Sequence, residues 1–67
     1  MIRLHVEGMS CEHCEARVRD ALAGVSGVER VVSVDRSTQE ALVEGAIDPG
    51  RLVAAAEAQG YRARVLS

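Results

Sequence analysis

The chain of 67 residues contains two cysteines, Cys11 and Cys14, which lie three positions apart. Thiols at this spacing can bind a soft metal ion, exchange between dithiol and disulfide, or supply half of a four-cysteine zinc site. The stretch that carries them reads Gly8-Met9-Ser10-Cys11-Glu12-His13-Cys14. The predicted elements before and after this stretch are needed to choose among these three kinds of site.

The segment before the cysteines has the alternation of a strand, and the segment after them has the period of a helix. Ile2, Leu4 and Val6 alternate with polar residues, which is typical of a strand with one buried face. After Gly8, Ser10 is the expected N-cap of an amphipathic helix. The apolar stripe of this helix consists of Cys14, Val18, Ala21, Leu22 and Val25. We therefore expect the thiols where a strand passes into the first turn of a helix.

A hairpin is predicted next. Residues 28–34 are rich in valine, residues 35–38 are typical of a turn, and residues 41–45 continue an alternating run. Val31 and Val32 are adjacent, so they cannot both face the core unless a bulge intervenes.

The last third of the chain predicts a helix and a strand. Asp48 and Pro49 start the helix, Gly60 ends it, and residues 61–65 alternate again. Both helices need the same face of the sheet to bury their apolar stripes. We therefore expect an α+β, ferredoxin-like βαββαβ open-faced sandwich, with two helices on one face of a four-stranded antiparallel sheet. Residues 1–67 are expected to form this single domain.

The predicted helix start favours thiolates and a monovalent soft ion. With Ser10 as the cap, Cys11 and Cys14 lie in the first turn, where free N–H groups and the helix dipole lower thiol pKa values. Two thiolates around Cu(I) leave a net negative charge that the same helix end stabilises. Zn(II) normally takes four ligands, so two thiolates without an obligatory third ligand favour Cu(I). An open site of this kind also lets a thiolate of another protein take the metal.

Composition and charge argue against several classes of protein. A formal net charge of -2 with mixed signs and a single aromatic residue do not predict the basic, aromatic surface that binds nucleic acid. The N-terminal segment is too short and too charged for a signal peptide, and no apolar run approaches the roughly 20 residues that span a bilayer. We expect a cytoplasmic protein without direct membrane insertion, in which both cysteines are free thiols. No catalytic triad is recognisable, so we do not expect an enzyme.

The motif Gly-Met-Ser-Cys-Glu-His-Cys, set between a strand and a helix, resembles the Gly-Met-x-Cys-x-x-Cys signature of heavy-metal-associated domains. The chain is identified as a member of that family over nearly its whole length, and it is similar to the bacterial cytosolic copper chaperones. Further matches to them are His13, the segment Ala41-Leu42-Val43 and the pair Gly60-Tyr61.

This resemblance implies a metal, its ligands and a partner. It implies that Cys11 and Cys14 bind Cu(I), and that the ion passes by thiolate ligand exchange to a copper-transporting P-type ATPase and its metal-binding domains. Zinc-exporting relatives usually have Asp immediately before the first cysteine, where this chain has Ser10. The resemblance therefore favours copper over zinc.

Other residues are expected to support the loop or adjust the site, namely Gly8, Met9, Ser10, His13 and Tyr61. Met9 is expected to anchor the loop by packing, because a thioether beside an apolar core is more often buried than metal-bound. His13 is expected in solvent, although a metal-bridged homodimer would favour its ligation. Tyr61 can place its hydroxyl near the thiolates or cover the edge of the core, and the sequence leaves both open.

Two other functions stay open. A carrier or transporter domain for zinc, cadmium or mercury also fits the thiols, and Zn(II) or other soft divalent ions are expected to bind in vitro. A thiol oxidoreductase shares the Cys-x-x-Cys pattern, but the chain is short and lacks the Trp-Cys-Gly-Pro-Cys character of that class. On the first helix, Arg17 and Arg19 are candidates for docking onto an acidic patch of a partner.

Overall fold

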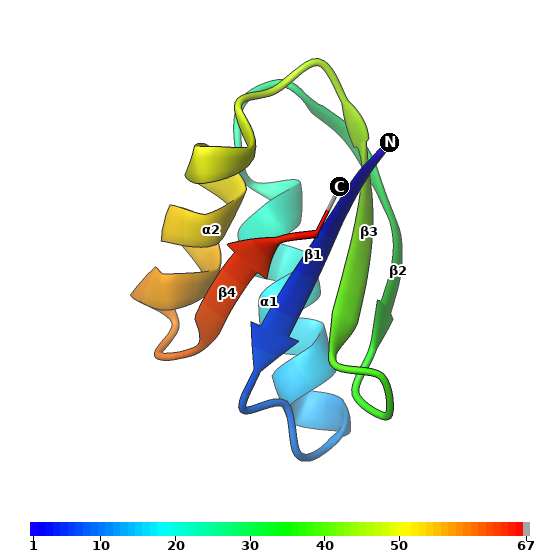
Figure 1. Cartoon of the computed structure of the whole chain (residues 1–67), viewed down its shortest axis with the longest axis vertical. Coiled ribbons are helices and arrows are strands. Elements are labelled where there is room, and N and C mark those ends of the chain that lie inside the picture. Colours follow the sequence, from blue (N-terminus) through cyan, green and yellow to red (C-terminus); the bar gives the residue numbers. More distant parts are fainter. Residues whose placement is uncertain (67) are drawn as a thin grey trace.

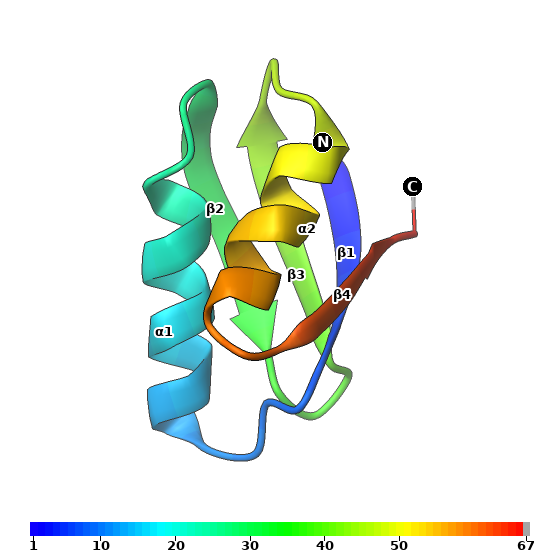
Figure 2. The same ribbon diagram turned by 90° about the vertical axis from the view of Figure 1, so that its left-hand side faces the viewer.

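The computed structural model describes residues 1–66, which form four strands and two helices in the expected order (Figure 1). The strands are β1 (Ile2–Glu7), β2 (Val28–Asp35), β3 (Glu40–Gly45) and β4 (Arg62–Val65), and the helices are α1 (Glu12–Ala23) and α2 (Pro49–Ala58). The strands form one antiparallel sheet in the order β2-β3-β1-β4. Both helices lie on one face of this sheet (Figure 2). The predicted ferredoxin-like sandwich is confirmed.

Small aliphatic side chains form the core between the sheet and the helices. Leu4 of β1 lies opposite Ala41 of β3, and both are completely buried. The other completely buried side chains are Val6, Val18, Leu22, Val43, Leu52 and Ala56. Burying a Val or Leu side chain contributes about 1.5–3 kcal/mol, so these few contacts provide most of the stabilisation of β1 and of both helices.

The bulge that the adjacent valines require is present in β2. Val31 pairs with Val43, and the next pair along the ladder joins Ser33 to Leu42, so Val32 is left without a partner. Val31 packs against the core, whereas Val32 is 36% exposed. The extra residue lets Val31 and Val34 share the inner face although they are three positions apart.

The turn between β2 and β3 begins one residue later than predicted. Asp35 stays in the strand, paired with Glu40, and its carboxylate accepts hydrogen bonds from the backbone N–H and hydroxyl of Ser37 at 2.8 and 2.6 Å. The hydroxyl is the main reason why the pKa of Asp35 is lowered. The chain then reverses with Gln39 in the left-handed region, at φ +58°.

The prediction that Ser10 caps α1 is wrong. Cys11 is the N-cap, with an extended backbone at φ -154° and ψ 174°, and its carbonyl accepts from the N–H groups of Cys14 and Glu15. The hydroxyl of Ser10 lies 4.0 Å from Cys14 Sγ. The predicted start of α2 is confirmed, because Asp48 is its N-cap and accepts from the N–H of Gly50 at 2.9 Å.

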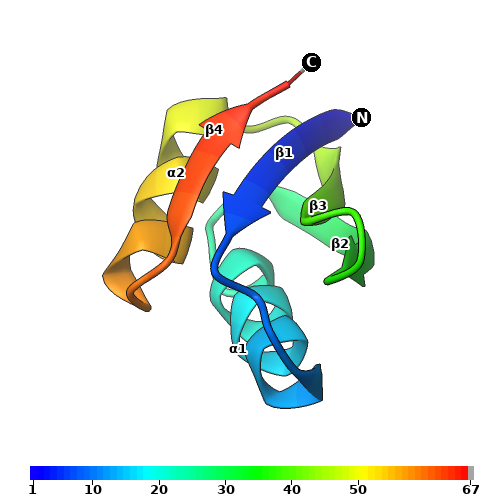
Figure 3. The same ribbon diagram turned by 60° about the horizontal axis from the view of Figure 1, so that its bottom comes forward.

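Three connections lie at the same end of the molecule (Figures 1 and 3). They are the β1–α1 loop that carries the cysteines, the β2–β3 turn, and the link from α2 to β4. Within residues 1–66, no helix has the length and apolarity needed to cross a membrane. The β1–α1 loop contacts both of the other connections, through hydrogen bonds to Gln39 and through the Tyr61 ring beside Gly8.

Candidate metal centre

Cys11 and Cys14 come together at the start of α1. Their Sγ atoms are 3.5 Å apart, and both are free thiols. Cys11 is exposed at the N-cap, whereas Cys14 is the third residue of the helix and packs partly against the core. One sulfur is therefore fixed by the helix and the other lies on the solvent side of it.

The distance between the sulfurs can be compared with the geometries of soft metal ions. With a metal–sulfur bond of about 2.3 Å, two sulfurs lie about 3.8 Å apart around a tetrahedral ion, about 4.0 Å around a trigonal one and about 4.6 Å around a linear one. The observed distance of 3.5 Å between the two Sγ atoms is nearer to the tetrahedral and trigonal values than to the linear one. A linear complex requires the sulfurs to separate by roughly 1 Å, and Cys11, which is exposed, is the side chain free to make that movement.

The Cys14 thiol ionises more readily than an ordinary cysteine. Its pKa is lowered to about 6, first by the Tyr61 hydroxyl, then by the backbone of Ser10 and by the thiol of Cys11. The Cys14 sulfur also lies 4.0 Å from Ser10 Oγ and 3.5 Å from Cys11 Sγ. At pH 7 Cys14 is mostly a thiolate, which is the form that binds metal.

Tyr61 combines the two roles that the sequence left open. Its side chain is 9% exposed and belongs to the core, while its hydroxyl acts on Cys14, which is the main reason why the pKa of Tyr61 is raised. The ring lies against Gly8, where an added Cβ would come within 3.3 Å of Tyr61 Cδ1. Gly8 also has φ +100°, so a side chain at this position would be strained as well as crowded.

The remaining predicted site residues lie in different environments. Met9 is 4% exposed and belongs to the core. His13 is exposed in the first turn of α1. Among residues 1–66, no third His, Cys, Asp or Glu joins the two thiols to form a group that could hold a metal. The structure thus brings Ser10 and Tyr61 to the sulfurs and leaves His13 in solvent.

Sequence reasoning missed Gln39. Its amide oxygen accepts hydrogen bonds from the N–H groups of Gly8 and Met9, and its amide nitrogen donates to the carbonyls of Met9 and Arg36. The residue lies 30 positions from Met9 in a polar turn, so local patterns gave no signal for these contacts. The positive φ of Gln39 is a feature that only the folded chain reveals.

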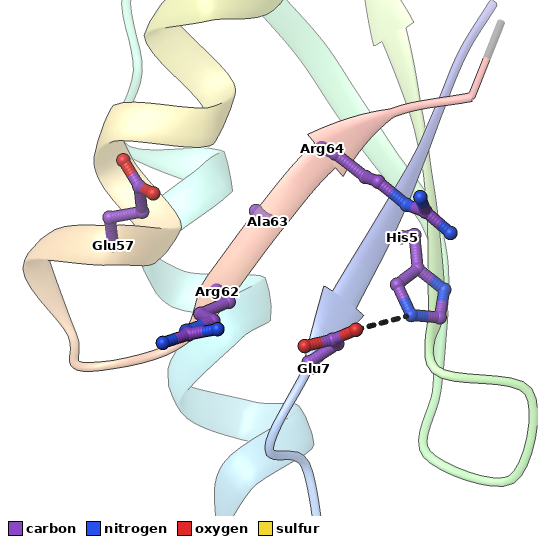
Figure 4. A pocket seen from close by; sticks show the side chains of 6 residues that line it. All are labelled: His5, Glu7, Glu57, Arg62, Ala63 and Arg64. Atoms are coloured by element: carbon purple, nitrogen blue, oxygen red, sulfur yellow. Dashed lines mark ion pairs between the residues drawn. The ribbon is translucent and has the colours of Figure 1, made fainter.

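A surface hollow of about 300 Å³ lies elsewhere, beside β1 and β4 (Figure 4). In this hollow, His5 Nε2 lies 3.5 Å from Glu7 Oε1. The lining residues are His5, Glu7, Glu57, Arg62, Ala63 and Arg64. Because neither cysteine lines it, the hollow is separate from the paired thiols.

Comparison with known proteins assigns the chain to a family. The model of the heavy-metal-associated domain matches residues 3–62, and the chain belongs to this family. It is 36% identical over 64 residues to the copper chaperone CopZ of Enterococcus hirae, covering 91% of each chain. Its fold superposes with a TM-score of 0.93 on a copper binding domain from HMA7, a P-type ATPase, at 29% identity, covering 98% of this chain and 92% of that domain.

A further relative is much larger. The chain is 44% identical over 59 residues to the mercuric reductase of Acidithiobacillus ferrooxidans, which is 87% of this chain but 11% of that enzyme. The chain thus spans only about a tenth of the length of the mercuric reductases that it matches. The likeness is to a small part of that enzyme.

Proposed function

We propose that residues 1–67 form a single heavy-metal-associated domain that carries Cu(I) on Cys11 and Cys14, as a cytoplasmic metallochaperone or buffer. The observation that carries this proposal is the pair of accessible sulfurs 3.5 Å apart at a helix start, one with a pKa of about 6. Gly8 and Met9 fix the loop, and Ser10 and Tyr61 stabilise the Cys14 thiolate. The proposal assigns no catalytic residue.

The metal moves by exchange of thiolate ligands. Each thiol that binds the ion loses its proton, and a thiolate of the acceptor then adds to the exposed metal. This first bond gives a three-sulfur intermediate, from which the bond to Cys11, the exposed and movable ligand, breaks; a second thiolate of the acceptor then adds, and the bond to Cys14 breaks last. The three-sulfur intermediate needs the two domain sulfurs about 4.0 Å apart, which is close to the spacing already present. No oxidant or reductant is required.

The proposed acceptor is a metal-binding domain of a copper-transporting P-type ATPase. Two relatives support this choice, because one is a copper chaperone and the other is a copper binding domain of a P-type ATPase. Nucleic acid is not proposed as a partner.

A second candidate cargo is Hg(II). The mercuric reductase relative favours it, and two thiolates without further protein ligands suit this soft ion as well. Zn(II) fits less well, since no third ligating side chain joins the thiols within residues 1–66.

An anaerobic titration of the reduced protein tests the proposal. Cu(I), Hg(II) and Zn(II) are titrated separately against competing chelators, with the Cys11→Ser/Cys14→Ser variant as the control. We expect tight binding of one Cu(I) per chain that needs both thiols and greatly exceeds Zn(II) binding. Mass measured on loading separates the monomer from a metal-bridged homodimer, in which the mass doubles.

Preference for Zn(II), or Cu(I) binding that persists without the thiols, would contradict the proposal. Preference for Hg(II) over Cu(I) under the same conditions would replace Cu(I) by the second candidate. Transfer is then measured by mixing the Cu(I)-loaded protein with a purified metal-binding domain of a copper-transporting P-type ATPase and following the metal on each chain.

A further inference from the structure

The Gln39 side chain makes every hydrogen bond that an amide offers. Its oxygen accepts from Gly8 N at 3.0 Å and from Met9 N at 3.3 Å. Its nitrogen donates to Met9 O at 2.7 Å and to Arg36 O at 2.6 Å. The orientation of the amide is fixed by its partners, because N–H groups face the oxygen and carbonyls face the nitrogen. Three of these four bonds go to the backbone immediately before the cysteine pair.

The backbone of Gln39 explains how the side chain reaches the loop. Its carbonyl accepts from Val6 N at 2.8 Å, and the next residue, Glu40, pairs with His5. The residue is thus fixed beside the end of β1. Its φ of +58° is rare for a residue with a side chain. Such a conformation persists where the surroundings impose it, and it occurs often at functional sites.

The same turn also holds the other side of the cysteine pair. Glu15, which follows Cys14 in α1, accepts from Arg36 N at 2.7 Å and from Arg36 Nη1 at 3.4 Å. The β2–β3 turn therefore binds the chain both before Cys11, through Gln39, and after Cys14, through Arg36. Figure 1 shows this turn and the cysteine loop at the same end of the molecule.

We infer that Gln39 is a positioning residue for the metal centre, through which the β2–β3 turn fixes the Gly8–Met9 backbone and so keeps the two sulfurs spaced to capture one ion. Gln39 contacts neither sulfur in the hydrogen-bond network and acts only through the loop. The inference about metal capture rests on the proposed function. The inference about loop order does not, since it concerns the metal-free protein.

Three variants test the role of Gln39. Gln39→Gly removes all four side-chain bonds and at the same time relieves the positive φ, so it separates loop positioning from global stability. Gln39→Glu keeps an oxygen for Gly8 and Met9 but places a second carboxylate oxygen against the carbonyls of Met9 and Arg36. Thr38→Gly is the matched control, because it places the same glycine in the same turn at an exposed residue. Each protein is examined by amide hydrogen exchange without metal and by Cu(I) titration against a chelator.

Gln39→Gly is expected to lose protection of the Gly8 and Met9 amides and to bind Cu(I) about tenfold more weakly, as is typical when a group that orients a metal ligand is removed. Gln39→Glu should also lose protection and affinity, because the carbonyls of Met9 and Arg36 repel its second oxygen. Thr38→Gly should match the wild type in both measurements. Affinity that follows melting temperature alone, without this order, would show a merely structural role and overturn the inference.

The exchange measurement keeps this test independent of the proposed function. If the wild type fails to bind Cu(I), the proposed function is contradicted, and the amides of metal-free protein still decide the role of Gln39. Retained protection of Gly8 and Met9 in Gln39→Gly would overturn the inference in either case. Lost protection in that variant, with Thr38→Gly unchanged, supports it.

Discussion

The two helices begin in opposite ways. α2 follows Asp48, whose carboxylate accepts a hydrogen bond from Gly50 N at 2.9 Å, and Pro49 occupies its first position. α1 follows Cys11, whose side chain makes no capping hydrogen bond. A side-chain cap typically contributes about 1 kcal/mol to stability. The start of α1 lacks this contribution at the place where the two thiols lie.

The difference separates a helix start that serves stability from one that, in the proposed function, serves a metal ion. At α2, the Asp48 carboxylate already accepts a hydrogen bond from the first free N–H, that of Gly50. At α1, the N–H groups and the helix dipole stay available for thiolates and for a metal complex with net negative charge. The network from Gln39 and Arg36 provides order that the cap does not. Stability is thus supplied from the β2–β3 turn, which leaves the sulfurs accessible.

The substitution Cys11→Asp should have the largest effect, because it turns the start of α1 into one like that of α2. Cu(I) affinity should fall by more than about 100-fold, beyond the range typical of indirect effects on a metal site. The free energy of unfolding of the metal-free protein should rise by about 1 kcal/mol, since a carboxylate at the N-cap accepts from the first N–H groups. Chelator competition and urea denaturation measure the two quantities. Unchanged copper affinity would contradict the role of this helix start.

The converse substitution, Asp48→Ala, should affect stability alone. Loss of the cap should lower the free energy of unfolding by about 1 kcal/mol. Cu(I) affinity of the folded protein should stay within twofold of the wild type, because Asp48 contacts Gly50 and no group of the metal centre. Denaturation and titration on the same sample check this. A large loss of affinity would mean that the two helix starts are not independent.

Tyr61→Phe should lower the thiolate fraction of Cys14 at the start of α1 without changing the fold. The hydroxyl is the main cause of the lowered pKa of Cys14, about 6, so its removal should raise this pKa toward the ordinary value of 9.0. A rise of about one unit would reduce the thiolate fraction at pH 7 by about half. In the wild type, the alkylation rate of Cys14 should fall as the pH decreases through 6.

The alkylation experiment uses a Cys11→Ser background, in which Cys14 is the single thiol. The alkylation rate of Cys14 is measured as a function of pH in this protein and in the same protein with Tyr61→Phe. An identical pH midpoint in the two proteins would exclude the hydroxyl as the cause. A small upward shift in both is expected from the background, because the Cys11 thiol also lowers the pKa of Cys14.

The smallest effect is expected on docking near the thiols. Arg17 is exposed on α1 and lowers the pKa of Tyr61, which partly offsets the effect of Cys14. Arg19 is exposed further along the helix. Arg17→Glu should slow Cu(I) transfer to an acidic acceptor domain by a few-fold at low salt, and Arg19→Glu should slow it less. Stopped-flow transfer at two salt concentrations tests this order. Transfer rates for both variants equal to that of the wild type would contradict the docking hypothesis.

The parts of the fold that follow from local patterns were predictable. Alternation of Leu4 and Val6 with polar residues defined the inner face of β1, and the Asp48-Pro49 pair defined the start of α2. The adjacent valines of β2 indicated the bulge at Val32 before the register was known. Each of these signals arises within a few residues of the chain, and folding did not alter it.

The parts of the site that depend on distant contacts were not predictable. Ser10 has the side chain of a good cap, but its hydroxyl lies beside Cys14, and Cys11 became the cap. Gln39 gave no local signal, because its partners in the cysteine loop lie 30 and 31 residues away. The two roles of Tyr61 depended on how the link between α2 and β4 meets Gly8.

We propose that the open start of α1 binds Cu(I) through the two cysteine sulfurs alone. X-ray absorption at the copper edge of the Cu(I)-loaded, reduced monomer tests it most directly. We predict two sulfur neighbours and no nitrogen or oxygen neighbour, with the signal lost in Cys11→Ser/Cys14→Ser. A nitrogen neighbour that disappears in His13→Ala, or a spectrum unchanged without the cysteines, would contradict binding by two sulfurs at this helix start.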